Sequence, residues 1–485
     1  ILLMVLFAVN IVVNGGIDLR ALVKDDLRFW MYYDNREGAL DFIFGAQDAK
    51  FRPVFFMLLY SLYKIFGNHI YLFDGFNLLL NFGVVAVLFL IFRKLSGNVW
   101  VSFCLGCIYL VSRFAYYVIS QVFGIEEALA LLGSVAIAYL MWRFVRTGQR
   151  QNYWLSIVLF TLVIFVHERY VTLLFFFMAV LISLGINRKN LVLFGIATLP
   201  VLLNFGIKKV MLGVNPLYGT GGLEITDTFN LSQVISFLIS GVHYIIGVNA
   251  GPIHLNGIPF DQVPWYLNVF ILLGIGCITL FGFLFLKHSL RQENQSNTGH
   301  TRTIILFLAF IFATLLGGCV TIRLEMRWVY TPFCGFLLLI AYLAGVLLTD
   351  PRLRKQALIL ITLWTLIVIP AELIYRTYYP NLYFWKTQTA GNQLYENTVG
   401  RYGNGFWDYD TYLICPDMKC PDLNYGEGDE LRLFFSQFSQ GMTVDHQITV
   451  VPDVSQIDPQ LLYAENVIIL RFDPQTYGVT EITHQ

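Results

Sequence analysis

Long apolar runs recur along this chain of 485 residues, separated by short polar segments. The hydrocarbon core of a bilayer is about 30 Å thick, and an α-helix needs about 20 apolar residues to cross it. The runs close to this length predict eleven membrane-spanning helices. They cover residues 1–16, 71–92, 99–112, 124–145, 152–166, 170–186, 190–209, 265–286, 303–320, 329–349 and 357–375.

Two other apolar segments do not fit this series of spans. Residues 229–248 are long enough to span, but counting them would place the basic 287–302 loop outside and leave the 249–264 loop inside without any Lys or Arg. Residues 53–66 are shorter than a span, and the long side chain of Lys64 can reach toward water. We expect both segments to lie in the membrane interface or to re-enter the membrane.

The basic residues of the loops predict the orientation, because Lys and Arg concentrate on the cytoplasmic side of membrane proteins. If the first run ends outside, every second loop faces the cytoplasm, and these loops carry thirteen basic residues but only two acids, Glu293 and Asp350. The basic residues are Arg93, Lys94, Arg143, Arg146, Arg150, Arg188, Lys189, Lys287, Arg291, Arg302, Arg352, Arg354 and Lys355. The N-terminus is therefore predicted to be cytoplasmic and the C-terminal tail external.

Composition agrees with a polytopic α-helical membrane protein. Hydrophobic residues make up 56% of the chain and charged residues 13%, with a mean hydropathy of +0.62. This is too apolar for an ordinary soluble chain of this length. The formal net charge is zero, so nothing suggests a nucleic-acid partner. We expect an integral protein of a plasma membrane, with a bacterial one as the default.

The pattern divides the chain into a membrane body, residues 1–375, and a tail, residues 376–485. Two external loops of the body, 17–70 and 210–264, are too long for simple connectors and are predicted to be functional. In the tail, short β-branched runs at 410–417, 446–453 and 466–473 predict strands, and 429–438 has helical spacing. We therefore expect a small external α/β domain.

Cys415 and Cys420 lie in this predicted external tail, where an oxidising compartment permits a disulfide. Zinc binding is the alternative interpretation, but no Cys or His nearby completes a set of four ligands. We expect the disulfide.

Charged residues near a membrane are costly, so those that remain at the external ends of the predicted helices are candidates for function. Four clusters lie there. They are Asp25 and Asp26; Arg52; His167, Glu168 and Arg169; and Arg323, Glu325 and Arg327. Two carboxylates beside several arginines could remove a proton from a hydroxyl while the guanidinium groups hold a phosphate.

Each cluster also has a purely structural interpretation. Asp25 and Asp26 could be solvated loop acids, and residues 167–169 could serve only to cap the turn between two helices. Residues 323–327 could form a local ion pair that adds little stability. Glu126 and Glu127 begin a predicted helix, where acids interact favourably with the helix dipole, and we interpret them first as capping residues. They remain possible substrate-binding residues, as do His167 and Glu168.

The order of these features resembles a known superfamily. The early acidic pair, the "KFRPVFFMLLY" segment and "NHIYLFDGFNLLLNFGVVAVLFLIFRKL" are similar to the GT-C glycosyltransferases that use polyprenyl-phosphate sugars. "SRFAYYVISQVFGIEEALALLGSVAIAYL" and "HERYVTLLFF" resemble the O-mannosyltransferase-like branch. The resemblance covers roughly residues 1–190, and beyond them it rests on the helix count, the "RLEMRWVYTP" loop and the tail.

The resemblance implies transfer of a monosaccharide from a polyprenyl-monophosphate donor to an acceptor hydroxyl at the outer face, usually with inversion. Asp25 or Asp26 would be the general base, and the two remain open. Arg52, Arg169, Arg323 and Arg327 would bind the donor phosphate. The acceptor could be a glycan, a lipid-linked molecule or a protein, and membrane lipids are further partners.

A divalent metal is a possible cofactor, because some members of the superfamily use one. Asp25, Asp26 and Glu168 carry the oxygen ligands that Mg²⁺ or Mn²⁺ prefers. Nothing in their spacing demands a metal, and we expect chemistry without one.

Two other functions share the many-helix plan. A transporter or flippase of a lipid-linked or anionic substrate would place ionisable residues deep within its helices, whereas the predicted spans contain almost none. A ligase that moves a whole glycan from a diphosphate carrier would not specially require an acidic pair after the first helix. A binding module on a membrane anchor would not need eleven helices.

Overall fold

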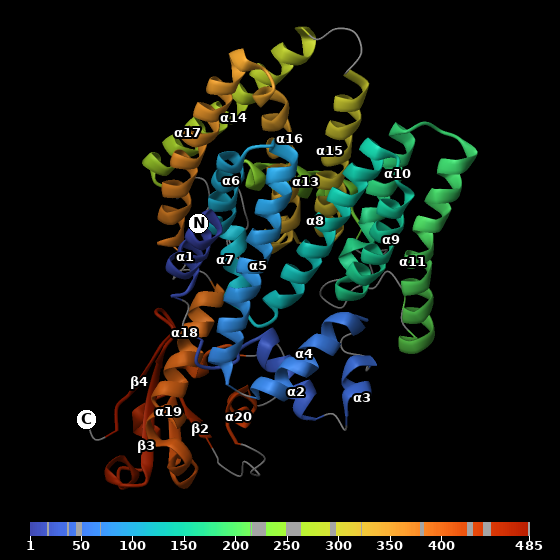
Figure 1. Cartoon of the computed structure of the whole chain (residues 1–485). Helices are drawn as coiled ribbons and strands as arrows, with labels where there is room; N and C mark the ends of the chain where they lie inside the picture. The colour runs from blue at the N-terminus through green and yellow to red at the C-terminus, as the bar shows by residue number, and fades with distance from the viewer. Residues whose placement is uncertain are drawn as a thin grey trace.

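A computed structural model describes residues 1–16, 19–35, 38–44, 51–67, 69–213, 215, 229–248, 263–291, 297–321, 323–378, 383–423, 430–439 and 448–483. Much of the predicted 210–264 loop and part of the 17–70 loop lie outside these residues. Helices predominate in these ranges, and the sheet that they contain lies near the C-terminus (Figure 1).

Among the described residues, seven helices are long and apolar enough to cross a membrane, which makes this a polytopic membrane protein. They are α5 (Ile70–Ser96), α8 (Gly124–Thr147), α11 (Arg188–Leu212), α14 (Trp265–Arg291), α15 (Asn297–Cys319), α16 (Tyr330–Leu348) and α17 (Pro351–Arg376). The other four predicted spans are also helical but shorter. They are α1 (Leu2–Asn14), α6 (Val99–Val111), α9 (Arg150–Val166) and α10 (Leu173–Ser183). The count of eleven spans therefore stays a prediction.

Local sequence explains where several of these helices begin and end. Asn98 starts α6 and accepts hydrogen bonds from the backbone N–H groups of Trp100 and Val101. Asp350 caps α17, and Pro351 occupies its first turn, where a missing N–H is harmless. Gly97 and Gly148 end α5 and α8 in the left-handed conformation that glycine adopts without strain.

The helical body has two distinct ends (Figure 1). The α10–α11 connection, the C-terminal end of α14 and the start of α15 lie at the end away from the sheet. At the sheet end, the body carries α2 (Asp25–Asp34), α3 (Ala39–Phe44) and α4 (Pro53–Phe66). Both apolar segments excluded from the spans form helices, α4 and α13 (Leu231–Ile245), of 14 and 15 residues. These are short of the roughly 20 residues that a crossing needs.

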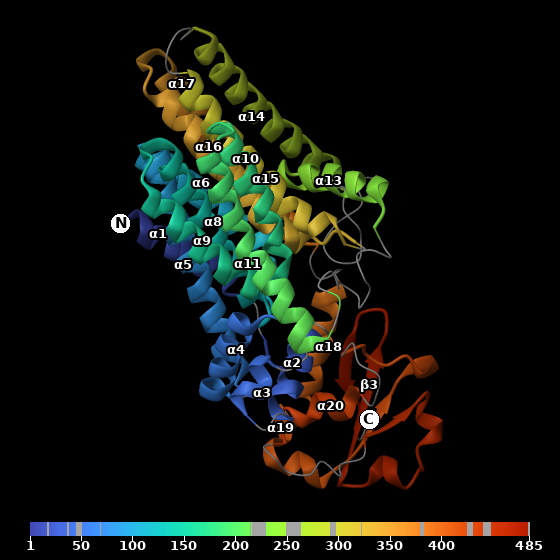
Figure 2. The same ribbon diagram turned by 90° about the vertical axis from the view of Figure 1, so that its right-hand side faces the viewer.

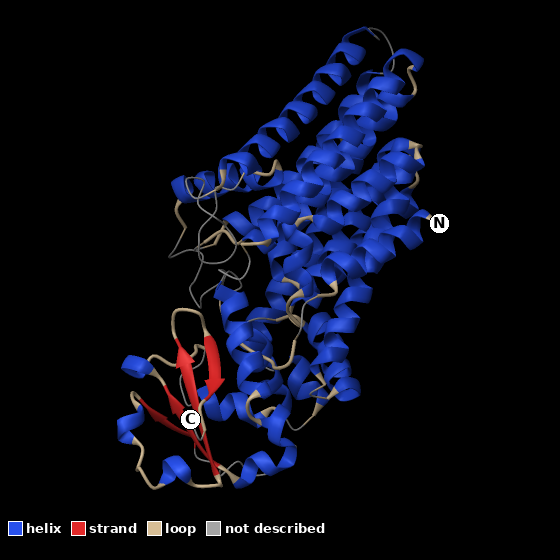
Figure 3. Cartoon of the chain, turned by 90° about the vertical axis from the view of Figure 1, so that its left-hand side faces the viewer, coloured by secondary structure: helices blue, strands red, loops and turns tan. Residues whose placement is uncertain are grey.

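The C-terminal residues fold as a four-stranded sheet with helices against it (Figure 3). Its strands are β1 (Asp410–Ile414), β2 (Ile448–Val451), β3 (Val467–Asp473) and β4 (Gly478–Glu481), in the order β2-β1-β3-β4. β1 is parallel to β2 and to β3, whereas β4 is antiparallel to β3. The helices of this part are α18 (Tyr383–Glu396), α19 (Val399–Tyr402) and α20 (Glu430–Ser436). We call residues 383–483 the C-terminal unit.

The three strands and the helix predicted in the tail are present, and β4 is an addition that its short, mixed sequence did not indicate. Cys415 and Cys420 form a disulfide, with their Cα atoms 5.1 Å apart.

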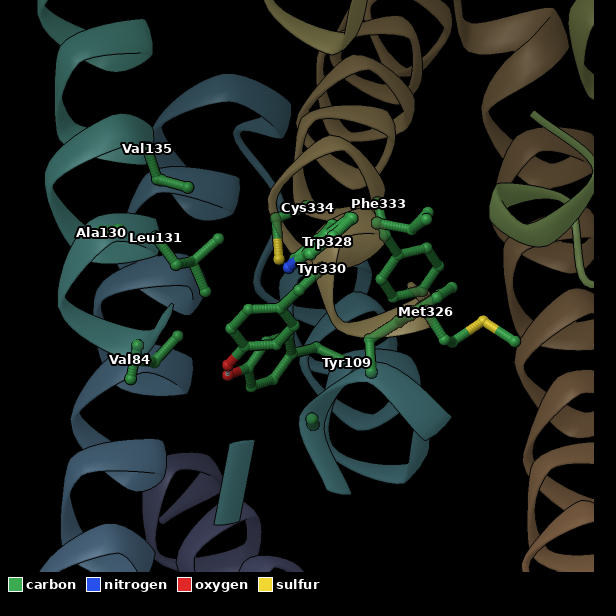
Figure 4. Close-up of a cluster of buried hydrophobic side chains, with 14 of the residues drawn as sticks. Val84, Tyr109, Ala130, Leu131, Val135, Met326, Trp328, Tyr330, Phe333 and Cys334 are labelled. Atoms are coloured by element: carbon green, nitrogen blue, oxygen red, sulfur yellow. Dashed lines mark hydrogen bonds between the residues drawn. The ribbon is translucent and has the colours of Figure 1, made fainter. Parts of the chain in front are cut away.

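Short helical turns complete the fold. They are α7 (Arg113–Ile119) and the 3-10 helices η1 (Glu168–Thr172), η4 (Met326–Val329), η6 (Gly403–Asp408), η7 (Pro416–Met418), η8 (Val454–Gln456) and η9 (Leu461–Tyr463). A buried core fixes η4 in the body (Figure 4): Met326 and Trp328 of η4 are buried, as is Tyr330, the first residue of α16, whose ring lies beside that of Tyr109 of α6. The hydroxyls of Tyr330 and Tyr109 meet there, and Tyr109 also contacts Asn81. This core holds the turn that carries Arg327.

Candidate functional site

The acidic pair begins α2, and its two members lie in different environments. Asp26 is buried, and its two carboxylate oxygens accept hydrogen bonds from the backbone N–H groups of Val122 (3.0 Å) and Phe123 (2.7 Å). Phe29, one turn along α2, stacks on the ring of Phe123 with centroids 4.9 Å apart. Asp26 therefore attaches the start of α2 to the segment that precedes α8.

Burial raises the pKa of Asp26 from 3.8 to about 7, because a desolvated carboxylate is costly. The two backbone N–H groups and Arg327 oppose this rise, while the charge of Asp25 adds to it. Asp26 therefore changes its charge near neutral pH, and the positive charge of Arg327 lies close enough to act on it.

Asp25 is partly exposed and is the less constrained of the two. Within the described residues its carboxylate has no hydrogen-bond or ion-pair partner. Its neighbours on both sides are held: Asp26 by the 122–123 backbone, and Lys24 by an ion pair with Asp422. Asp25 thus presents a carboxylate that is available to a substrate from a fixed position.

Arg52 immediately precedes α4, whose first residue is Pro53. The guanidinium is buried between two carboxylates: its Nη1 atom lies 2.7 Å from a Glu126 oxygen, and its Nε atom lies 2.8 Å from a Glu168 oxygen. Burial alone would raise the pKa of Glu168, but Arg52, with a smaller contribution from Lys208, lowers it to about 2. Arg52 therefore ties α4, α8 and η1 together, and its Nε and Nη2 donors are both directed at Glu168.

Arg169 forms a second link between the same elements. Its Nη2 atom lies 2.6 Å from a Glu127 oxygen, and the His167 ring nitrogen Nε2 lies 3.9 Å from the other oxygen. The second terminal nitrogen of Arg169, Nη1, is buried and has no hydrogen-bond partner among the described residues. A buried guanidinium nitrogen without a partner is energetically costly, so this N–H group is a candidate donor to a bound anion.

The 323–327 loop forms the third part of the site. Glu325 is fully buried and pairs with Arg323, at 2.8 Å, and with Arg327. The local ion pair that the sequence suggested is therefore present. Trp328 connects this loop to Arg169, because the guanidinium carbons of Arg169 and Arg327 lie 5.5 and 6.0 Å from its ring centroids. Such cation–aromatic contacts hold both arginines at one place.

These contacts bring the four clusters selected from the sequence together at the end of the body that carries the C-terminal unit. Glu126 and Glu127 join them: both lie in the first turn of α8, where no side chain caps the helix, and both pair with arginines. Most of the positive charge is already balanced by carboxylates. Arg323, whose side chain is 45% exposed, is the most accessible of these cations, whereas the Nη1 atom of Arg169 is buried and has no hydrogen-bond partner among the described residues.

Lys208 also belongs to this site, and the sequence analysis missed it. It is buried near the end of α11, and its charge acts on Glu168 and Arg52. The available signal was its position, since Lys208 and Lys209 lie at the predicted external end of a span, where basic residues are not favoured.

The three metal candidates do not fit a metal site. Among the described residues, no group of three or more His, Cys, Asp or Glu side chains is arranged to hold a metal ion. Both oxygens of Glu168 accept hydrogen bonds from Arg52, and both oxygens of Asp26 accept from backbone N–H groups. This donor set leaves Asp25 without a second carboxylate to share a cation.

An apolar cleft lies at the start of α7. Its lining comes from α6, α7, α13, α14, α16 and α17. Its polar members include Arg113 and Glu372, whose Nη2 and Oε1 atoms lie 2.8 Å apart, and Tyr244. The buried Tyr244 hydroxyl has no hydrogen-bond partner among the described residues. α7 starts at this cleft and leads to the 122–123 backbone that holds Asp26.

Comparison with known proteins does not identify a relative. No family model matches the sequence, and no curated protein matches it. The interpretation of the site therefore rests on its geometry and on the short motifs of the sequence.

Proposed function

We propose that this protein is a membrane glycosyltransferase that moves a monosaccharide from a polyprenyl monophosphate to an acceptor hydroxyl. In this proposal, the end of the body that carries the C-terminal unit faces the outer side of the membrane. The observation that carries the proposal is the Asp25 carboxylate, which is held between two anchored neighbours, one of which, Asp26, feels the positive charge of Arg327. A base and cations at one place are what such a transfer requires.

In the proposed reaction, Asp25 is the general base. It takes the proton of the acceptor hydroxyl while the oxygen of that hydroxyl forms a bond to the anomeric carbon. The bond from this carbon to the phosphate oxygen breaks at the same time, and the polyprenyl phosphate leaves with the electron pair. A single displacement of this kind inverts the anomeric carbon. Asp26 orients Asp25 by holding the start of α2 in place.

The departing phosphate gains negative charge, so fixed cations near it accelerate the step. Arg169 is our first candidate, because its Nη1 atom is a buried donor without a partner among the described residues. Arg323 and Arg327 lie next, on the loop that Trp328 connects to Arg169. Arg52 is directed at Glu126 and Glu168, which favours a role in holding the site together over phosphate binding.

The apolar cleft is the proposed binding site for the lipid part of the donor. Isoprenoid chains are apolar and gain free energy when they leave water. α7 contains seven residues, so at 1.5 Å per residue it bridges about 10 Å between the cleft and the segment that holds Asp26. A chain lying in the cleft would place its phosphate toward the arginines.

The outward orientation is supported by two independent features. Basic residues are concentrated in the loops at the opposite end of the body, as expected of a cytoplasmic side. The C-terminal unit contains a disulfide, which persists in oxidising compartments outside the cytoplasm. The acceptor at that side would be a glycan, a lipid-linked molecule or a protein. We take the membrane to be a bacterial plasma membrane.

Single Asp25→Asn and Asp26→Asn variants test the assignment of the base. The assay offers purified protein a panel of polyprenyl-phosphate hexoses and pentoses with membrane-derived acceptors, and it measures release of polyprenyl phosphate. We expect Asp25→Asn to abolish release while the protein keeps its thermal stability. Asp26→Asn should reduce both release and stability, because an amide oxygen cannot accept from both backbone N–H groups in the same way. Full activity of Asp25→Asn would refute the assignment.

A further inference from the structure

The segment before the acidic pair is buried although it has no regular secondary structure. Residues 19–24 connect the start of α2 to the preceding chain, and Leu19, Ala21, Leu22, Val23 and Lys24 are each at most 5% exposed. Buried backbone N–H and C=O groups must find partners, because an unpaired group costs free energy comparable to a lost hydrogen bond. The partners of this segment show what holds it.

These partners come from the C-terminal unit, which is more than 360 residues away along the chain. The Leu22 N–H group donates to the side-chain oxygen of Gln437 (2.7 Å), and the Gln437 amide donates to the Leu22 carbonyl (3.3 Å). The Ala21 carbonyl accepts from Gln388 (2.9 Å), and the Arg20 N–H group donates to Asn392 (2.8 Å). Side chains of the C-terminal unit thus supply the hydrogen-bond partners that a neighbouring strand normally supplies to an extended segment.

Lys24 completes the contact directly before Asp25. Its N–H group donates to the Leu423 carbonyl (2.6 Å), and its buried ammonium pairs with Asp422. Lys24 has a φ of 56°, a conformation that costs a residue other than glycine free energy and persists only when surrounding contacts impose it. α18 approaches closely as well: a Cβ atom on Gly391 would lie 2.5 Å from a methyl group of Val23.

We infer that the C-terminal unit positions the general base, and that Gln437 is a positioning residue for the transfer reaction. This inference rests on the proposed function, because it assumes that Asp25 acts on the acceptor. Gln437 fixes both backbone groups of Leu22, three residues before Asp25. Asp26 is fixed independently by the body, so the base lies between one anchor from each part of the molecule.

The geometry explains why both anchors are needed. α2 is a helix of ten residues whose start carries the base, and Figure 2 shows it beside α20. Without the C-terminal anchor, Asp26 alone would hold the start of α2, and Asp25 could turn away from the acceptor. A displacement of about 1 Å in a reacting group can cost a hundredfold in rate. The C-terminal unit would therefore be needed for turnover with any acceptor, and not only for the choice of acceptor.

The test compares Gln437→Ala with Gln456→Ala, which removes an exposed glutamine from the same unit. The first measurement is hydrogen–deuterium exchange of the full-length protein in detergent. We expect backbone N–H groups of residues 20–27 to exchange about tenfold faster or more in Gln437→Ala, and at the wild-type rate in Gln456→Ala. The second measurement is turnover with the donor that the wild type uses, together with binding of polyprenyl phosphate.

We expect turnover of Gln437→Ala to fall between about tenfold and a hundredfold, with the affinity for polyprenyl phosphate unchanged within about twofold. If Gln437→Ala does not fold, Gln437→Met serves instead, because it keeps the volume of the buried side chain and removes both hydrogen bonds to Leu22. A loss in the same direction is then expected.

Two results would overturn the inference. Unchanged exchange in residues 20–27 would show that Gln437 does not hold the segment. Faster exchange with wild-type turnover would show that the contact is structural only. Failure of the proposed function is recognised separately: a wild type without transfer from any donor overturns that function, and this inference with it, before any variant is compared.

Discussion

Asp25 and Asp26 are adjacent in sequence, but burial and hydrogen bonding give them different chemical properties. Asp26 is 6% exposed and bonded through both oxygens, whereas Asp25 is partly exposed and has no such partner among the described residues. A base must reach the proton it removes, so geometry comes before pKa in choosing between them. This consideration selects Asp25 and leaves Asp26 as the residue that orients it.

The raised pKa of Asp26 predicts a pH-dependent stability. Between its ordinary value of 3.8 and its folded value of about 7, the folded chain holds a proton that the unfolded chain has released. Stability therefore falls as the pH rises through this range, because the unfolded state binds fewer protons there. The neutral Asp26→Asn variant lacks this titration. Its melting temperature in detergent should fall less between pH 5 and 8 than that of the wild type. Parallel melting curves for the two proteins would contradict this prediction.

At the residue scale, the sequence predicted the four charged clusters because charge is rare in this chain and each cluster lies at the end of an apolar run. It could not predict the pairing. Nothing in the order of residues indicates that Arg52 lies between Glu126 and Glu168, or that Trp328 contacts Arg169. Lys208 was missed because it lies within the apolar pattern of a span.

At the scale of elements, one end of α7 lies at the apolar cleft and the other leads to the segment that holds the acidic pair. Arg113, its first residue, lines the cleft and pairs with Glu372 of α17. The chain after α7 supplies the N–H groups that hold Asp26. The cleft, which is the proposed lipid site, and the acidic pair are thus separated by one short helix.

The cleft predicts a sharp difference between two glycines of α14. Gly274 lines the cleft, and a Cβ atom there would meet only Ile367 and Trp364, at 3.8 and 3.9 Å. Gly276 lies two residues further, outside the lining, with open space around it. Gly274→Phe should weaken binding of polyprenyl phosphate about tenfold or more, because the new ring would displace part of the isoprenoid chain from the cleft. Burial of an apolar group as large as a side chain contributes about 1.5–3 kcal/mol to binding. Gly276→Phe is the control, and equal affinities in a binding titration would exclude the cleft as the lipid site.

Element boundaries followed the hydrophobic pattern closely, because membrane helices must satisfy all their backbone groups internally. Every predicted span contains a helix, but four of these helices are short. α6 illustrates the reason: its apolar run continues to residue 112, but the chain leaves the helical conformation at Ser112, and α7 begins at Arg113. Hydropathy records the apolar run and not this break.

At the scale of the whole molecule, the C-terminal unit is joined to the start of the chain by contacts that no local pattern could reveal. Gln437 and Leu22 are 415 residues apart, and both are unremarkable in sequence. The strands of the unit were predictable from short β-branched runs, whereas its attachment beside the acidic pair was not. The sequence therefore indicated a separate tail, and the structure places that tail against the proposed base.

The central claim is that this site serves a polyprenyl-monophosphate sugar. Native mass spectrometry of the detergent-purified wild type, with polyprenyl monophosphate and polyprenyl diphosphate added in equal excess, tests it most directly. We expect the monophosphate, or its monosaccharide ester carried through purification, to bind in preference, and the mass of a bound ester would identify the class of sugar. Preference for the diphosphate would indicate a glycan ligase. Binding of neither lipid would contradict the account and favour a transporter of another substrate.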